Sequence, residues 1–124
     1  MSADQIAEIA PFIREVFAHA NKHATTDETL CATFEVVGVD GAWAQVTLVE
    51  LNMAYPLGHS PEEELGEIVR RLPGGRLLSW EPYKFATWSF VSVNPAEVAK
   101  AVDLIFAKVF RLTDYAIDGQ LEHL

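Results

Sequence analysis

Apolar residues recur along the chain with two different periods, and each change of period marks the boundary of an element. Residues 3–22 place apolar side chains three and four positions apart, which predicts an amphipathic helix. Pro11 lies inside this pattern, so the helix either begins there after a short turn or is kinked there. The polar stretch from Asn21 to Thr29 then ends the helix.

Two further helices are predicted from their start signals. Ser60 and Pro61 precede the sequence EEELGEIVRRL, and Asn94 and Pro95 precede AEVAKAVDLIF. Serine and asparagine are favoured N-caps, and proline is favoured at the first helical position. The Pro-Gly-Gly run at residues 73–75 ends the first of these two helices.

Between the helices, apolar and polar residues alternate with the period of strands. Segments 33–37 and 42–51 flank a Gly-Val-Asp-Gly turn and predict one hairpin, in a register that places Phe34 opposite Leu48 and Val36 opposite Val46.

Residues 76–91 predict a second hairpin that turns near Lys84. This register pairs Trp80 with Trp88 and Leu78 with Phe90, so we expect these four side chains in the core.

The expected order of elements is α-ββ-α-ββ-α, with one extra short strand as an option over residues 52–57. This order indicates the α+β class, with a single antiparallel sheet of two hairpins and the helices packed on one face. No linker divides the 124 residues, so we expect residues 1–124 to form a single domain. The tail, residues 113–124, either covers a sheet edge, adds to a dimer interface or lies free.

Charge and cysteine content narrow the classes of function. Nine Lys and Arg against eighteen Asp and Glu give a net charge of −9 at pH 7, which repels nucleic acid and anionic lipid and favours a basic or neutral hydrophobic partner. Cys31 is the single cysteine, and we interpret it as a small buried hydrophobe. The chain shows no signal-peptide pattern and no apolar run of membrane-spanning length, so we expect a cytoplasmic, bacterial protein without nucleic-acid or membrane contacts.

Polar clusters that could carry chemistry have simpler explanations. Glu15, His19 and His23 are spaced by four, as helix-borne metal ligands are, but no second cluster supplies the ligands that would close a site. His59 and Ser60 lie beside an acidic run like a fragment of a catalytic triad. Helix capping already accounts for Ser60, and no nucleophile elbow is present. We therefore expect no catalytic residue, no metal and no cofactor.

The face of the sheet that the helices leave open is predicted to be apolar as well. It would carry Val37, Val39, Trp43, Val49, Leu51, Leu77, Val91 and Val93. Isolated exposed hydrophobes are normal on soluble proteins, but eight on one face would form a larger patch than monomers usually show. We therefore expect a partner to cover this face.

The layout also resembles a known group of proteins. The Asp40-Gly41 hairpin, the segment AYPLGHSPEEEL before the middle helix and the segment VNPAEVAKAVDLIF at the last helix carry the likeness. A small acidic chain in the order α-β-β-β-α-β-β-α resembles the type III secretion chaperones and the related YbjN-like proteins of bacteria, over about residues 3–112. The resemblance implies a homodimer that presents hydrophobic patches to an extended client segment, without catalysis or cofactor. The tail LTDYAIDGQLEHL departs from the family pattern.

Two functions follow as hypotheses. The first is a non-enzymatic, homodimeric protein-binding module; its contact residues would be Trp43, Val49, Val91 and Leu104, with Tyr83 and Phe85 at the rim. The alternative is a small-molecule binding protein or enzyme with an apolar pocket between the aromatic hairpin and the middle helix. That pocket would be lined by Tyr55, His59, Trp80 and Trp88.

Overall fold

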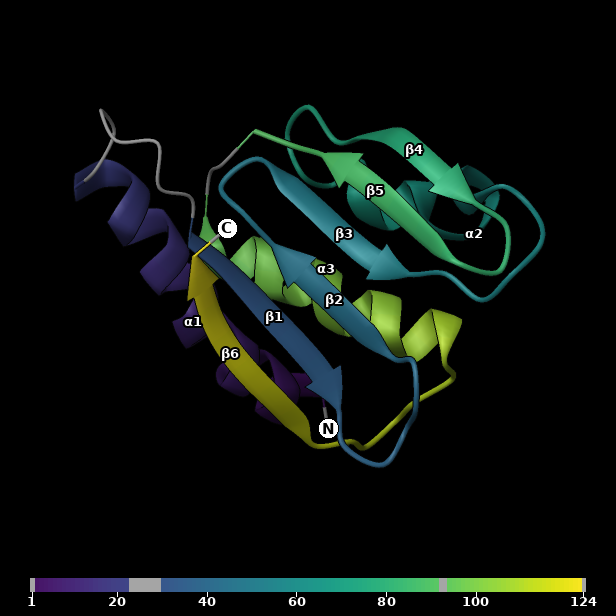
Figure 1. Ribbon diagram of the computed structural model, residues 1–124, viewed down its shortest axis with the longest axis horizontal. Coiled ribbons are helices and arrows are strands. Elements are labelled where there is room, and N and C mark those ends of the chain that lie inside the picture. The colour runs from purple at the N-terminus through teal and green to yellow at the C-terminus, as the bar shows by residue number, and fades with distance from the viewer. Residues whose placement is uncertain (1, 23–29, 92–93, 124) are drawn as a thin grey trace.

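The structure is a computed structural model that describes residues 2–22, 30–91 and 94–123 (Figure 1). Its elements follow in the order α1 (Ser2–Lys22), β1 (Leu30–Val36), β2 (Trp43–Val46), β3 (Glu50–Ala54), α2 (Pro61–Val69), β4 (Arg76–Glu81), β5 (Phe85–Ser89), α3 (Pro95–Val109) and β6 (Ile117–His123). The strands form one antiparallel sheet in the order β4-β5-β3-β2-β1-β6, and the helices lie behind it on one face. The predicted α+β class, with helices on one face of an antiparallel sheet, is confirmed. No helix among the described residues combines the length and the apolar character needed to cross a membrane.

The helix starts follow the predicted capping signals. The Ser60 hydroxyl accepts a hydrogen bond from the Glu62 N–H at 3.3 Å, and the Asn94 side-chain oxygen accepts one from the Ala96 N–H at 2.9 Å. Helix α1 continues through Pro11, which lies on its exposed side, so the start of the helix precedes the proline.

The predicted register of the first hairpin is wrong. Phe34 pairs with Ala44 and Glu35 with Trp43, because the loop 37–41 is longer than the turn that the sequence suggested. The Val36 N–H bonds to the Ala42 carbonyl at 3.0 Å and closes this loop. Gly38 and Gly41 adopt φ values of +81° and +79°, in the left-handed region that favours glycine.

The long strand predicted over residues 42–51 is broken in the middle. Thr47 donates its N–H to the Glu50 carbonyl at 2.9 Å, and its hydroxyl accepts from the Glu50 N–H at 3.1 Å, so the chain turns between β2 and β3. The turn reverses which alternate positions face the helices. Val46 faces inward in β2, and Leu51, predicted on the open face, is 0% exposed in the core.

A β-bulge makes a similar change in the second hairpin. Trp80 pairs with Ala86 and Leu77 with Trp88, and the register shifts between residues 77 and 79. Leu77 therefore packs against the core, although we expected it on the open face. Leu78, predicted in the core, is 46% exposed and is the bulged residue. Both predictions were wrong because one extra residue reverses the alternation.

The C-terminal segment settles one of the alternatives left open for the tail. Residues 117–123 form β6, which pairs along the whole length of β1 at the edge of the sheet. Val37 continues the ladder by donating its N–H to the Ala116 carbonyl at 2.9 Å. The tail therefore covers the edge that β1 would otherwise expose.

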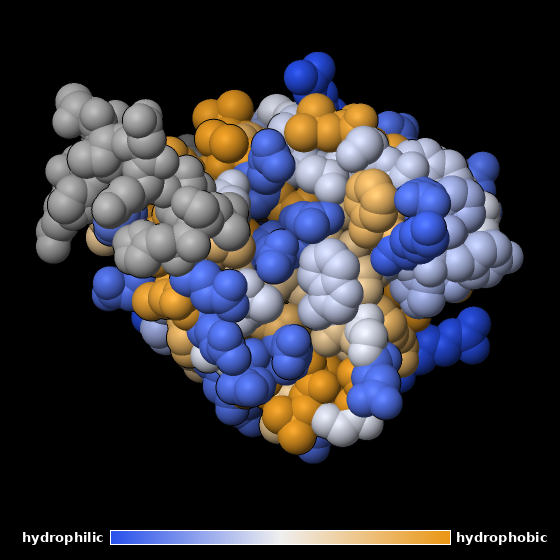
Figure 2. All heavy atoms as spheres, in the orientation of Figure 1, coloured by the Kyte–Doolittle hydropathy of each residue, from blue (hydrophilic) through white to orange (hydrophobic). Residues whose placement is uncertain are grey.

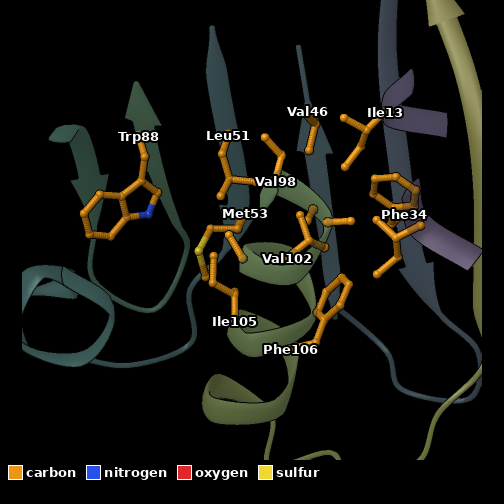
Figure 3. Packing of buried hydrophobic residues seen from close by; sticks show 14 of the residues in the cluster. Ile13, Phe34, Val46, Leu51, Met53, Trp88, Val98, Val102, Ile105 and Phe106 are labelled. Atoms are coloured by element: carbon orange, nitrogen blue, oxygen red, sulfur yellow. The ribbon is translucent and has the colours of Figure 1, made fainter. Parts of the chain in front are cut away.

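The core lies between the sheet and the helices (Figure 3). It contains buried side chains from α1, from strands on both sides of the sheet centre and from α3, among them Ile13, Phe34, Val46, Leu51, Met53, Trp88, Val98, Val102, Ile105 and Phe106. Phe12 meets Phe34 edge to face, with ring centroids 5.7 Å apart, and so joins α1 to β1. Trp88 and Phe90 were predicted in the core and are buried there.

A small polar network crosses this apolar layer and holds the segment before β6. Tyr115 donates its hydroxyl hydrogen to the Asp103 carboxylate of α3 at 2.6 Å, and Asp103 is only 2% exposed. Gln5 of α1 donates to the Tyr115 carbonyl at 2.9 Å. Buried polar groups are costly unless they are paired, so this network specifies how α1, α3 and the tail meet.

We predict that Tyr115→Phe lowers the free energy of unfolding by about 1–3 kcal/mol, because it leaves the buried Asp103 carboxylate without its hydroxyl donor. Urea-induced unfolding measures the loss. Tyr83→Phe is the matched control, since Tyr83 is 73% exposed, and its change should stay within about 0.5 kcal/mol. Equal stability of the Tyr115 variant and wild type would contradict the role of this hydrogen bond.

Candidate functional site

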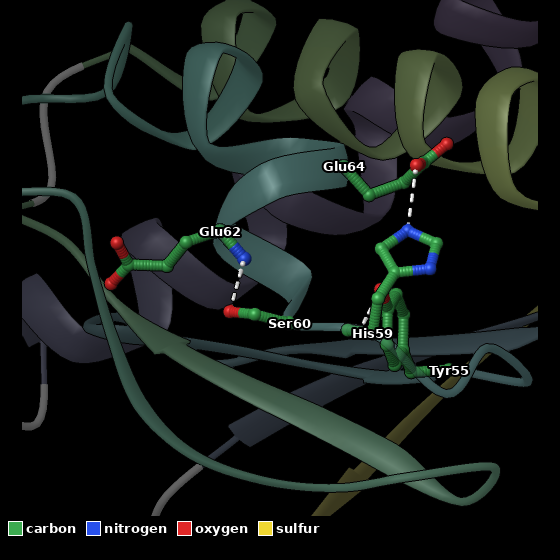
Figure 4. Close-up of polar contacts among 5 residues, drawn as sticks. All are labelled: Tyr55, His59, Ser60, Glu62 and Glu64. Atoms are coloured by element: carbon green, nitrogen blue, oxygen red, sulfur yellow. Dashed lines mark hydrogen bonds and ion pairs between the residues drawn. The ribbon is translucent and has the colours of Figure 1, made fainter.

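The polar residues that resembled a triad fragment are held apart (Figure 4). His59 Nε2 lies 3.0 Å from Glu64 Oε2, whereas the Ser60 hydroxyl accepts from the Glu62 backbone. The His59 ring therefore points to Glu64 and away from the serine, and the serine caps α2. The arrangement stabilises the start of α2 and does not place a base against a nucleophile.

Tyr55 holds the loop that carries His59. Its hydroxyl donates to the His59 carbonyl at 2.7 Å, and its ring meets Trp80 edge to face at 6.2 Å between centroids. Burial of this phenol, with the nearby Glu64 and Glu63 carboxylates, raises its pKa to about 12. Tyr55 is therefore a neutral hydrogen-bond donor at ordinary pH.

The residues of the alternative pocket are packed together. Tyr55 contacts both His59 and Trp80, and Tyr55 and Trp88 are almost completely buried. Tyr83 covers the loop from outside, where a Cβ at Gly58 would collide with its ring. The ring contacts of Tyr55 with His59 and Trp80 hold these three side chains against one another.

Cys31 and the acidic and histidine side chains are the other groups that could carry chemistry. Cys31 is 1% exposed, and burial raises the pKa of its thiol, so it stays protonated and is a weak nucleophile. Among the described residues, no group of three or more His, Cys, Asp or Glu side chains is placed to hold a metal ion. The candidate His23 lies outside the described residues.

The open face of the sheet is polar, and this corrects the expectation of an apolar surface. The paired residues across the six strands form one uncharged row of Gln120, Thr33, Gln45, Asn52, Thr87 and Ser79. Thr87 donates to the Asn52 side-chain oxygen at 2.8 Å within it. Figure 2 shows this face with hydrophilic residues through its middle and hydrophobic ones in separated groups. Antiparallel sheets commonly expose such a polar face to water.

The predicted contact residues consequently fall on different parts of the molecule. Trp43 and Phe85 are half-buried on the open face, each paired with a neighbouring strand. Tyr83 lies in the turn between β4 and β5 with φ +62°. Val37 and Val39 belong to the loop after β1, and Val93 lies outside the described residues.

Val49 and Val91 are brought together at the end of the sheet near the start of β4. The Phe90 N–H bonds to the Val49 carbonyl at 2.9 Å, and the Val91 N–H to the Pro73 carbonyl at 2.7 Å. Val49 is 50% and Val91 61% exposed, so together with Pro73 they form an apolar end patch. We call these three residues the end patch.

A groove continues from the end patch between α2 and α3. Its first part, about 190 Å³, is lined by Arg71, Leu72, Pro73, Val91, Asn94, Glu97 and Val98. A smaller part, about 40 Å³, follows along Ile68, Lys100, Ala101 and the predicted contact residue Leu104. We call this surface the α2–α3 groove. It is lined by two of the predicted contact residues, Val91 and Leu104, and lies beside the helices instead of on the open sheet face.

A second hollow, of about 430 Å³, lies at the opposite end of the open face. Glu35, Asp40, Trp43 and Asp118 line it together with the loop 37–42. Of the residues predicted on the open face, Val37, Val39 and Trp43 line it, and only Trp43 was a predicted contact residue. Pairing of β6 with β1 places Asp118 beside Glu35. This contact could not be predicted, because the sequence left the position of the tail open. The acidic Asp40-Gly41 loop was the one local signal of an acidic site.

Comparison of the chain with family models, curated proteins and solved structures gives no match.

We predict that stability falls steeply above about pH 10, because Tyr55 and Tyr115 have raised pKa values in the folded protein. Burial raises the pKa of Tyr115, and its hydrogen bond to Asp103 raises it further. Both phenols lose their proton near pH 10 when the chain is unfolded but keep it when folded. The unfolded state then binds fewer protons, and each tyrosine lowers the free energy of unfolding by about 1.4 kcal/mol per pH unit.

Urea midpoints between pH 8 and pH 12 measure this dependence, with tyrosinate absorbance as an independent readout. Between about pH 10 and pH 12, Tyr55→Phe should make the fall of the free energy of unfolding with pH less steep by about 1.4 kcal/mol per pH unit, the contribution of one tyrosine. A variant as steeply pH-dependent as wild type would contradict the assignment.

Proposed function

We propose that this chain is a non-enzymatic protein-binding module that acts as a homodimer. The observation that carries the proposal is the α2–α3 groove with the end patch beside it, where exposed Val91 lines an apolar depression. Exposed apolar surface with a polar border is typical of protein interfaces. The resemblance to secretion chaperones implies the same class of role.

The charge distribution favours a second copy of the chain as the occupant of this groove. The chain carries a net charge of −9, so two copies repel each other over most of their surface. Arg70, Arg71 and Arg76 lie at the C-terminal end of α2 and the start of β4, and Lys100 lies in the groove wall. Four of the nine Lys and Arg residues are therefore near this end.

The groove also offers self-complementary charges. Arg71 and Glu97 both line it, so a twofold axis through the groove can place each arginine near the other subunit's glutamate. Apolar contact between the two end patches would supply the rest of the interface. Mixed charges around an apolar centre suit an isologous dimer.

A binding role agrees with the use of the polar side chains. Ser60 caps α2, His59 pairs with Glu64, Tyr55 donates to the His59 carbonyl, and Tyr115 donates to the buried Asp103 carboxylate. These groups stabilise loops and helix starts. Their hydrogen bonds leave the exposed surfaces as the part of the molecule best suited to function.

We predict that wild type sediments at twice 13.8 kDa and that Val91→Glu weakens the dimer at least about 100-fold, because the variant buries a carboxylate in an apolar contact. Sedimentation equilibrium measures both constants. Val37→Glu is the matched control. Val37 is similarly exposed, at 60%, but it follows the C-terminal end of β1, at the end of the sheet opposite Val91. The dimer dissociation constant of the Val37→Glu variant should therefore equal that of wild type.

A charge exchange sharpens the test. Arg71→Glu should weaken the dimer about tenfold by placing like charges together, and the double variant Arg71→Glu with Glu97→Arg should restore it. A wild type that is monomeric at about 100 µM, or a Val37→Glu dimer weakened as much as the Val91→Glu dimer, would sink the proposal.

A further inference from the structure

The hollow at the far end of the open face has the chemistry of a cation site. Pairing of β1 with both its neighbours places Glu35 directly beside Trp43 on one side and beside Asp118 on the other. Asp40 approaches from the loop 37–41. Like charges directly opposite each other in a sheet are destabilising, so the Glu35–Asp118 pair has a cost that a positive partner would relieve.

No cation of the chain offsets this charge within the described residues. The ion pairs that they form involve Glu64, Glu81 and Glu97, none of which lies at the hollow. The outward positions of the strands carry Glu35, Glu50, Glu81, Asp118 and Glu122 against a single cation, Arg76. The face is therefore acidic at its borders, although its middle row is uncharged.

The shape of the hollow suits a side chain better than a small ion. The described carboxylates form no group placed to hold a metal. The hollow is about 430 Å³ in volume, with the Trp43 indole and exposed Val37 in its wall. An arginine can lay its guanidinium on an indole, pack its stem on apolar atoms and bond to carboxylates at the same time.

We propose that this hollow binds an arginine of an extended, basic segment of a partner protein, which lies across the open face of the sheet. The proposal rests on the proposed function as a protein-binding module. It adds that the partner segment is positively charged and that the hollow is the site that binds it. The uncharged amides and hydroxyls of the middle row supply hydrogen bonds for the backbone of that segment. The self-association surface lies at the other end of the strands, so the two contacts are separate.

Fluorescence anisotropy with the labelled peptide Gly-Val-Arg-Val-Arg-Val-Gly tests the site. The double variant Glu35→Gln with Asp118→Asn should bind the peptide at least about tenfold more weakly than wild type. Trp43→Leu should also weaken it. The peptide with glutamine in place of arginine should not bind, and rising salt from about 20 mM to about 300 mM should reduce the affinity of the arginine peptide.

The control variant Glu62→Gln with Glu67→Gln removes the same charge from exposed positions of α2. It should retain the wild-type affinity to within about twofold. If this control loses as much affinity as the hollow variant, the attraction is that of a generally acidic surface and the site is overturned. Displacement of the peptide by about 1 mM calcium chloride would instead identify a metal site and also overturn it.

Thermal unfolding separates binding from folding. Relief of the like-charge pair should leave the melting temperature of the double variant equal to or above that of wild type, so weaker binding cannot be attributed to unfolding. Sedimentation of the wild type, compared with its peptide binding, separates the proposed dimer from the proposed arginine site. A wild type that dimerises but does not bind the peptide overturns the arginine site alone. A monomer that binds the peptide overturns the self-association alone.

Discussion

Helices cover only one face of the six-stranded sheet, so every strand must direct its large apolar side chains to that face. Side chains alternate strictly along a strand, and a single extra residue exchanges the two faces. The chain meets this constraint with two local breaks: the turn at Thr47–Glu50 and the bulge at Leu78. The turn places Leu51 in the core, and the bulge exchanges two leucines, so that Leu77 packs against the core and Leu78 is left exposed. The polar open face is the direct result.

The position of the tail depends on a second, polar constraint. Tyr115 and Gln5 tie the segment before β6 to α3 and α1, and the Asp103 carboxylate is buried at the centre of this network. From that point the chain can reach the free edge of β1 and pair along its length. The network therefore contributes to the hollow as well, because it sets the position from which Asp118 enters the sheet beside Glu35.

The helices and the class of fold were predictable because their signals are local. Ser60, Asn94 and the prolines that follow them act within one turn of helix, and the period of the apolar residues does not depend on distant contacts. Register was not predictable, because the turn at Thr47 and the bulge at Leu78 break strands that read as continuous. The same error affected the predicted site, because the prediction of an apolar open face depended on unbroken alternation along each strand. Val91 and Leu104 line the α2–α3 groove and Val49 is exposed, but these positions do not follow from an apolar sheet face.

Charge links the two proposed surfaces. The cations near the α2–α3 groove reduce the repulsion between two acidic chains at the one end where we propose that they meet. A dimer formed there would carry twice the charge of one chain, −18 from two contributions of −9, and its open faces would keep their acidic borders. Self-association would thus strengthen the negative electrostatic field that attracts a basic segment. The two equivalent hollows of a dimer would let a partner with two such segments bind with increased avidity. The α2–α3 groove and the hollow lie at different ends of the strands, so both contacts are compatible in one small chain.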